Sequence, residues 1–403
     1  MELPSELHGF LPAFKQSIVT YFLDVGGLVA GFIVTYQMGL VQLSPWALAV
    51  YPGIVSAKSI TSGLFSGRLC TALHLGTVHP RFMGNTRIFY RLLETMIMLT
   101  LLTSLMMSAI SMGFGILFWG ITAADFANLF VVVVATMTLG LTLSLLTVKV
   151  AFITFKRGSD PEVSAYPFTF ALSGILMTAY YVLILRLFFQ YGHVGRNATA
   201  LICTASAVIA FFILLRSVRD REFINALKEP LLTLLVASVI FNITGTVFKR
   251  IGAVTAGRNE VIAVYPALTS VANDVGSTIS QTATTKLALG LLKPSLGSIR
   301  GHATQILSSW IASVIMFGLF SVLCLFVSDG LAANSLAAFT ALLLLTNILG
   351  VALTVITAYG LSVITFLKGL DLDNSVIPVQ SVLVEGMVTV ALLAALLFTG
   401  WMP

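Results

Sequence analysis

The chain has 403 residues, of which 58% are hydrophobic and only 9% are charged, whereas a water-soluble globular chain carries about 25% charged residues. This composition excludes a soluble enzyme and a nucleic-acid-binding protein, so the formal net charge of +6 reflects membrane topology. It predicts an all-α polytopic membrane protein that is not an enzyme. The three cysteines lie in or beside apolar runs and indicate neither a disulfide framework nor a metal cluster.

Apolar runs long enough to cross a bilayer, which takes about 20 residues, recur along the chain. In chain order we expect eleven spans, at residues 14–36, 47–72, 90–118, 124–150, 163–190, 198–216, 230–250, 261–288, 303–328, 334–366 and 376–400. Thirteen basic residues fall on the N-terminal side of these spans and four on the other side. The N-terminus is therefore expected in the cytoplasm and the C-terminus outside, with the protein in the plasma membrane and in contact with its lipids.

Three blocks of sequence occur twice, in the same order. Residues 49–56 (AVYPGIVS) recur as residues 263–270 (AVYPALTS), and residues 153–160 (ITFKRGSD) recur as residues 364–371 (ITFLKGLD). Between them, the pattern Thr-x-Leu-x-Leu-Gly at residues 71–76 recurs at residues 285–290, and a proline follows each copy, at Pro80 and Pro294. The copies are 214 or 211 residues apart. Three blocks in the same order at nearly one offset indicate an internal duplication of the chain.

The duplication divides the chain into three parts. We expect a first five-helix repeat at residues 1–195, a linking transmembrane helix with its cytoplasmic loop at residues 196–229, and a second five-helix repeat at residues 230–403. Because five spans are an odd number, direct fusion would invert the second copy, and the linking helix restores its direction. The repeats are then parallel, and their interface is the expected place for a pathway.

Four prolines interrupt the predicted spans in repeat-equivalent pairs, Pro52 with Pro266 and Pro167 with Pro378. A proline frees the carbonyl four residues earlier, and lipid cannot satisfy that carbonyl. Such carbonyls are tolerated where they face protein or a watery cavity. A packing kink is the simpler interpretation, but the paired placement beside polar residues favours the lining of a pathway.

Acidic and polar residues also occur inside the spans. After Pro266, Ser, Asn, Ser, Gln and Thr side chains follow one face of a helix, and Asp24, Asp274 and Glu385 lie within spans. A carboxylate there costs roughly 2.5–3.5 kcal/mol on insertion scales and usually marks function. For Asp24, a buried pair with Lys58 is an equal alternative. The residues expected to bind a cation are Glu385, Asp274, Asn273, Asp24, Asn242 and Ser381.

Further acids precede the last predicted span of each repeat, at its cytoplasmic mouth. Solvated helix-capping residues are one interpretation, and a vestibule that attracts cations is the other. These acids are Asp160, Glu162, Asp371 and Asp373. Oxygen ligands without a ligand-spaced set of His or Cys favour a hard cation such as Mg²⁺ or Ca²⁺.

These motifs resemble those of the MgtE-type divalent-cation transporters, and particularly their eukaryotic solute-carrier and archaeal relatives that fuse two MgtE domains. The second repeat is similar to the family's Asp-Pro-Asp-Asn segment and following proline at Asp371, Asp373, Asn374 and Pro378. Glu385 stands where the family has a metal-binding Asp, and Gly174 takes that place in the first repeat. Asn273 and Asp274 stand where the family has Gly-Asn.

The resemblance implies transport of a divalent cation, with Mg²⁺ as the expected substrate, by a channel or a Na⁺-coupled exchanger. In the exchanger Na⁺ is the coupling ion; no cofactor is expected, and the fusion of two copies predicts a monomer. Two other functions stay open. One is an ion-coupled carrier of a small organic solute, since Lys58 and Arg68 would suit an anionic substrate. The other is a non-transporting membrane scaffold.

Overall fold

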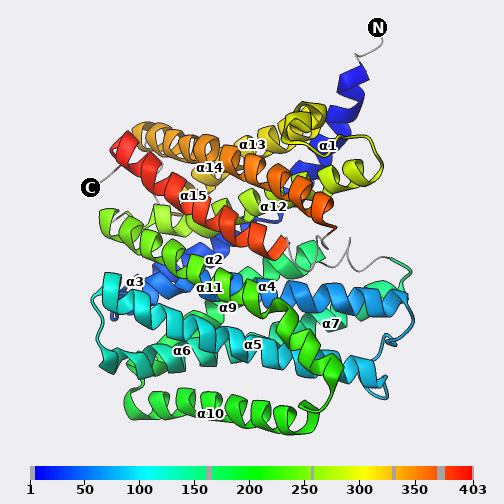
Figure 1. Ribbon diagram of the computed structural model, residues 1–403. Coiled ribbons are helices and arrows are strands. Elements are labelled where there is room, and N and C mark those ends of the chain that lie inside the picture. The colour runs from blue at the N-terminus through cyan, green and yellow to red at the C-terminus, as the bar shows by residue number, and fades with distance from the viewer. Residues whose placement is uncertain (1–4, 160–165, 256–257, 329–332, 370–376, 402–403) are drawn as a thin grey trace. The chain divides into compact units, whose positions relative to one another are not determined.

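The computed structural model describes residues 5–159, 166–255, 258–328, 333–369 and 377–401, and its regular structure there is entirely helical (Figure 1). Within these residues, nine helical segments are long and apolar enough to cross a membrane. They are Gly9–Tyr36, Arg87–Trp119, Ala123–Lys156, Leu172–Gln190, Gly192–Ser217, Arg221–Val254, Leu296–Val327, Ser335–Lys368 and Val379–Thr399. The predicted class, an all-α multi-pass membrane protein, is confirmed.

The two other predicted spans, 47–72 and 261–288, are also helices but are more polar. They correspond to α4 (Ala47–His74) and α12 (Glu260–Ala288), which have 28 and 29 residues. At 1.5 Å per residue they are about 42–44 Å long, enough to cross a bilayer. Buried lysine in α4 and the Asn273–Asp274 pair in α12 lower their hydropathy. Nine candidate spans are thus shown, and the total of eleven stays a prediction.

The chain forms two compact units. Unit 1 comprises Met1–Thr35 together with Val247–Pro403, and unit 2 comprises Tyr36–Thr246. The first helices of the chain therefore belong to the unit that the C-terminal half builds. Most of α11 (Arg221–Val254), which is the first helix of the second predicted repeat, belongs to the unit that the N-terminal half builds.

Unit 1 is built around α12. Its other elements are α1 (Ser5–Phe22), α2 (Val25–Tyr36), η3 (Leu296–His302), α13 (Ala303–Val327), α14 (Ala333–Lys368) and α15 (Ile377–Thr399). α12 contacts α1, α13, α14 and α15, and α14 packs along α15 (Figure 1). The side chains of Val264, Leu268, Val271 and Val275 are fully buried, so α12 forms the apolar core of this unit.

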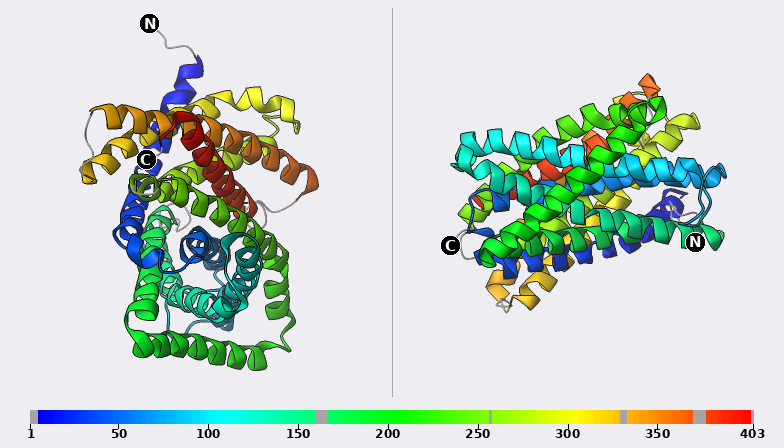
Figure 2. Two further views of the ribbon diagram at one scale, coloured as in Figure 1. Left: turned by 90° about the vertical axis from the view of Figure 1, so that its left-hand side faces the viewer. Right: turned by 90° about the horizontal axis from the view of Figure 1, so that it is seen from below.

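Unit 2 is built around α4. Its other elements are α3 (Met38–Val41), α5 (Arg87–Phe114), η1 (Gly115–Trp119), η2 (Ala123–Asp125), α6 (Phe126–Leu139), α7 (Leu141–Lys156), α9 (Tyr166–Gln190) and α10 (Gly192–Ser217). α4 is the inner helix, in contact with α5, α6, α7 and α9 (Figure 2, left). Phe65 and Leu69 of α4 pack with Phe89 and Phe152 in its apolar core.

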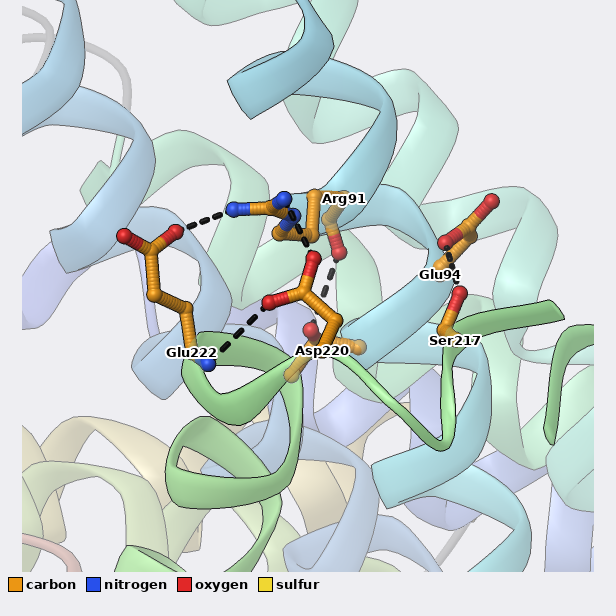
Figure 3. A network of polar contacts seen from close by, with 6 residues as sticks. Arg91, Glu94, Ser217, Asp220 and Glu222 are labelled. Carbon is orange, nitrogen blue, oxygen red and sulfur yellow. Dashed lines mark hydrogen bonds and ion pairs between the residues drawn. The ribbon is translucent and has the colours of Figure 1, made fainter.

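α10 lies along the outer edge of unit 2, and only 11% of its most apolar stretch is buried (Figure 1). The connection from α10 to α11 is fastened to α5 by charged groups (Figure 3). Arg91 forms ion pairs with Asp220 and Glu222, and the Ser217 hydroxyl donates to Glu94 Oε2 at 2.9 Å. These acids therefore anchor the connection, which explains why they are tolerated beside a membrane span.

The same tyrosine–threonine contact occurs in both units. Tyr51 Oη lies 3.1 Å from Thr178 Oγ1 in unit 2, and Tyr265 Oη lies 2.8 Å from Thr389 Oγ1 in unit 1. The two tyrosines are 214 residues apart and the two threonines 211, the same offsets as the duplicated sequence blocks. Each pair ties the central helix of its unit to α9 or α15.

The central helices also end alike. Gly76 follows α4 with φ 69°, and Gly290 follows α12 with φ 71°. This left-handed conformation is open to glycine at little cost and commonly closes the C-terminus of a helix. Gly76 and Gly290 are again 214 residues apart.

Candidate cation site

Five of the six residues predicted to bind a cation lie in unit 1. Asp24 stands between α1 and α2, Asn273 and Asp274 lie on α12, and Ser381 and Glu385 lie on α15. The sixth residue, Asn242, lies in unit 2. The acids predicted to form a vestibule, Asp160, Glu162, Asp371 and Asp373, fall outside the described residues.

The first membrane segment is broken at Asp24, although the sequence predicts one continuous helix. α1 ends at Phe22 and α2 begins at Val25. In the break the Asp24 amide donates to the Tyr21 carbonyl at 3.1 Å, and the Gly27 amide donates to the Asp24 carbonyl at 2.8 Å. Broken helices at membrane depth expose backbone dipoles that can hold ions, and Asp24 stands at this break.

Two glycines bring the backbone of α2 against α12. A Cβ on Gly27 would lie 2.6 Å from Ala267 Cα, and a Cβ on Gly31 would lie 1.8 Å from the Ala263 carbonyl oxygen. Only glycine fits at either position. Since the position along α12 falls as that along α2 rises, the two helices run antiparallel. This register places Asp24 beside the turn of α12 that follows the Tyr-Pro motif.

Asp24 and Asp274 lie close enough to interact electrostatically, and we refer to them as the Asp24–Asp274 pair. Asp24 Oδ2 is buried and has no hydrogen-bond partner in the described part of the chain. Tyr21 is fully buried, and its hydroxyl lies beside Asp274 and Thr278. Two half-buried carboxylates that interact repel each other when both are ionised, and a cation between them would offset that repulsion.

Glu385 lies on the opposite side of α12 from Asp24. Tyr265 and Gly276 are the positions of α12 that face α15, whereas Ala263 and Ala267 face α2. At about 100° per residue these two faces are roughly half a turn apart. Asp274 is seven residues, or about two turns, beyond Ala267 and therefore shares the α2 face.

The structure thus brings Asp24 together with Asp274 on the α2 face of α12, whereas Ser381 and Glu385 lie on α15, which packs against the opposite face of α12. Among the described residues, no three His, Cys, Asp or Glu side chains come close enough to hold a metal ion. Glu385 is almost fully buried, with 5% of its surface exposed, and Ser381 is half-buried. The polar groups of unit 1 are therefore distributed along α12.

Two residues of this region escaped the sequence analysis. Tyr21 is an aromatic residue in an apolar run, three residues before Asp24, and that spacing places both on one face of a helix. Gln380 is an amide in the apolar segment of α15, next to Ser381. Distance from a mid-span acid could have identified both, since polar groups inside a membrane tend to gather.

Unit 2 carries neutral residues at the corresponding places, and it buries a lysine elsewhere on α4. Asn242, the counterpart of Asp24, is buried in the uninterrupted α11 and donates from Nδ2 to the Ser238 carbonyl at 2.8 Å. Gly174 stands where unit 1 has Glu385. The fully buried Lys58 donates from Nζ to Ser144 Oγ at 2.7 Å.

The other basic residue of α4 also has a protein partner. Arg68 Nη2 lies 2.8 Å from Glu229 Oε2, and Nη1 donates to the Ala226 carbonyl at 3.3 Å. Lys58 and Arg68 are the groups on which an anionic organic substrate would depend. Their hydrogen bonds within unit 2 make that function less favourable than cation binding.

The prolines fall into two classes. Pro52 and Pro266 lie inside α4 and α12, where each removes a backbone hydrogen bond as expected. Pro167 and Pro378 are the second residues of α9 and α15. A proline in the first turn costs no internal hydrogen bond, so these two begin helices and do not interrupt them.

Comparison with known proteins supplies one match. The model of the MgtE family, described as a divalent cation transporter, matches residues 51–184, which are 134 of the 403 residues. The matched segment lies within unit 2. No curated protein and no solved structure matches the chain.

Proposed function

We propose that this protein carries a divalent cation across the membrane, with Mg²⁺ preferred, and that unit 1 supplies the groups that bind it. The observation that carries the proposal is the half-buried Asp24–Asp274 pair at a break in a candidate membrane span. In the described part of the chain neither carboxylate forms an ion pair with a basic residue. Their charge is then available to a cation.

The chemistry of the pair suits a strongly hydrated ion. Mg²⁺ sheds its water reluctantly and is usually held by one or two carboxylates with several waters retained. Around the pair, the hydroxyls of Tyr21 and Thr278 are hydrogen-bonding groups that can contact such waters. The match to the MgtE family supports a divalent cation as the substrate.

The duplicated contacts support a two-repeat architecture. We propose that residues 1–195 and 230–403 are parallel five-helix repeats joined by residues 196–229, because Tyr51–Thr178 and Tyr265–Thr389 recur at the offsets of the sequence blocks. A cytoplasmic N-terminus and a monomeric state complete the proposal, with transport by a channel or by an exchanger that uses Na⁺ as its coupling ion. The position of the pathway at the interface of the repeats stays a prediction.

The test is Mg²⁺ flux into proteoliposomes that contain the purified full chain. Asp24→Asn and Asp274→Asn each remove one negative charge with little change in volume. We expect each to lower flux by at least about 30-fold, as is typical when one partner of a buried charged contact is lost. Repeating the assay with and without a Na⁺ gradient separates an exchanger from a channel.

Asp125→Asn is the matched control. Asp125 accepts hydrogen bonds from Thr122 at the start of η2, and asparagine keeps an acceptor there while removing the same charge. Flux through this variant should equal that of the wild type. Wild-type flux through folded Asp24→Asn and Asp274→Asn proteins would exclude the pair as the cation site.

A further inference from the structure

The connection between α10 and α11 carries three arginines within six residues. Arg216, Arg219 and Arg221 are all exposed, and in the part of the chain that the structure describes their side chains form no ion pair or hydrogen bond. A single exposed arginine is common at the cytoplasmic end of a membrane span. Three of them together concentrate positive charge in one place, and we refer to residues 216–221 as the arginine turn.

The arginine turn is compact. The Asp220 amide donates to the Ser217 carbonyl at 3.0 Å, and this hydrogen bond closes a tight turn. The two ends of such a turn lie within about 7 Å of each other. Arg219 is inside the turn, and Arg216 and Arg221 flank it directly. The three side chains therefore start from one small region of the surface.

The acids beside these arginines already have partners in the protein. Arg91 of α5 forms ion pairs with Asp220 and Glu222, and Glu94 of α5 accepts the Ser217 hydroxyl (Figure 3). These contacts hold the acids of the turn, so they do not neutralise its arginines. They also fix the turn to unit 2, and a ligand that binds there needs to order little of the backbone.

Beside the arginine turn, α10 presents an apolar surface. α10 is a candidate membrane span, and only 11% of its most apolar stretch is buried in the protein. Phe211, Phe212 and Leu215 lie in the last two turns of helix before Arg216, and each is exposed over more than half of its surface. Apolar surface and positive charge thus follow each other along α10. A phospholipid has the complementary order, since its acyl chains are followed by a phosphate.

The opposite end of α10 lacks this arrangement. The arginine there, Arg196, lies over the ring of Phe188 on α9, with its Cζ atom 5.8 Å from the ring centroid. The three arginines without a protein partner are at the end that the predicted topology places at the cytoplasm. The cytoplasmic leaflet of a membrane carries anionic lipids, which attract clusters of basic residues beside membrane spans.

We propose that the arginine turn binds the headgroup phosphate of an anionic membrane phospholipid, whose acyl chains lie along the exposed face of α10. Guanidinium groups form paired hydrogen bonds with phosphate oxygens, which fixes the headgroup on the turn. The bound lipid then holds α10 at one depth in the bilayer. The site lies wholly within unit 2 and uses no residue of the Asp24–Asp274 pair, so it does not depend on the proposed function.

The test measures how tightly the purified full chain in detergent binds phosphatidylglycerol and phosphatidylcholine with the same acyl chains, by native mass spectrometry. The wild type should bind phosphatidylglycerol more tightly. In the triple variant Arg216→Gln/Arg219→Gln/Arg221→Gln we expect the phosphatidylglycerol affinity to fall at least about tenfold, because each arginine at a membrane surface contributes about fivefold. Phosphatidylcholine binding should not change. Equal affinity of the wild type for the two lipids would overturn the proposal.

The matched control removes three other exposed basic residues from the same end of unit 2. These are Arg81, Lys156 and Arg157, which lie near that end because the rings of Phe89 on α5 and Phe152 on α7 are in contact, with centroids 5.6 Å apart. Arg81→Gln/Lys156→Gln/Arg157→Gln should keep the phosphatidylglycerol affinity within about twofold of the wild type, since salt screens separated surface charges. An equal loss in both triple variants would show an effect of net charge alone and refute the site.

A soluble phosphate is distinguished from a lipid by its lack of acyl chains. Phosphatidylglycerol should raise the melting temperature of the wild type, whereas glycerol phosphate should not. Equal stabilisation by glycerol phosphate would assign the turn to a soluble ligand and contradict the lipid site. If the triple variant of the turn does not fold, Arg219→Gln alone should lower the phosphatidylglycerol affinity about fivefold. An unchanged affinity in that folded variant would also exclude the proposed site.

Discussion

Units 1 and 2 share their packing and differ in their buried charges. Both tie the central helix to a later helix through a Tyr–Thr contact. Unit 1 adds the Asp24–Asp274 pair and Glu385, whereas unit 2 has Gly174 at the place of Glu385 and buries Lys58. The comparison teaches that two units can share the contacts that hold their helices together while only one of them carries residues suited to ion chemistry.

Helix breaks follow the same division. In unit 1 the first membrane segment is broken at Asp24, whereas α11 continues through Asn242. In unit 2 the break lies between α6 and α7 at Gly140, where a Cβ would come within 3.2 Å of Lys58 Cδ, whereas α14 is continuous. Each unit therefore interrupts a helix beside a charged residue of its own, and a break leaves backbone polar groups free to contact that charge.

The largest expected effect is on the acid that one unit has and the other lacks. Glu385→Gln should lower Mg²⁺ flux in proteoliposomes by about 30–100-fold, because a buried carboxylate inside a predicted span is lost and such groups usually mark an ion pathway. Gly174→Ala is the counterpart in unit 2, where a Cβ meets no atom within 4 Å, and it should leave flux unchanged. Equal losses in both variants would mean that the units contribute alike.

A smaller effect, on stability, is expected at the glycines through which α2 packs against α12 and α11 packs against α4. A Cβ on Gly31 would lie 1.8 Å from the Ala263 carbonyl oxygen, and one on Gly245 would lie 1.9 Å from that of Ala49. Gly31→Ala and Gly245→Ala should each lower the free energy of unfolding by about 2–3 kcal/mol, measured by SDS titration in mixed micelles. Gly113→Ala is the control, because a Cβ there meets no atom within 4 Å, and it should leave the free energy of unfolding unchanged. A harmless Gly31→Ala would contradict the packing of α2 on α12.

The smallest effect concerns the buried lysine of unit 2. Ser144→Ala removes the acceptor of the Lys58 ammonium and should cost about 1.5–3 kcal/mol of unfolding free energy in the same titration. Lys58→Met should be neutral or stabilising, since an apolar side chain of similar size needs no acceptor. The double variant should then be as stable as Lys58→Met alone. A strongly destabilised Lys58→Met protein would show that the charge itself holds unit 2 together.

The class of fold and most spans could be predicted because long apolar runs are local signals. The break at Asp24 could not, since its i to i+3 hydrogen bonds depend on packing against α12. Nor could the division into units, because the contact of Gly27 with Ala267 joins residues 240 positions apart. Such long-range pairing leaves no periodic pattern in one sequence.

Single residues of the candidate site could be predicted from the sequence, but not which of them lie close together in the structure. Mid-span position alone singles out Asp24 and Asp274, because a buried carboxylate is costly wherever it points. Which acids meet depends on the rotation of α12 about its axis. That rotation turns Asp274 toward α2, whereas Glu385 lies on α15, which packs against the opposite face of α12. Tyr21 and Gln380 were missed because single polar residues in apolar runs commonly serve packing.

The composition of unit 1 also dictates an order of assembly during synthesis. Its first piece, Met1–Thr35, leaves the ribosome well before α12, the helix whose backbone it needs for its closest contacts. At about 5–20 residues per second, more than 200 intervening residues impose a delay of roughly 10–45 s. Unit 2 ends at Thr246, so it can close once that residue has left the ribosome, while the N-terminal helices still wait for α12.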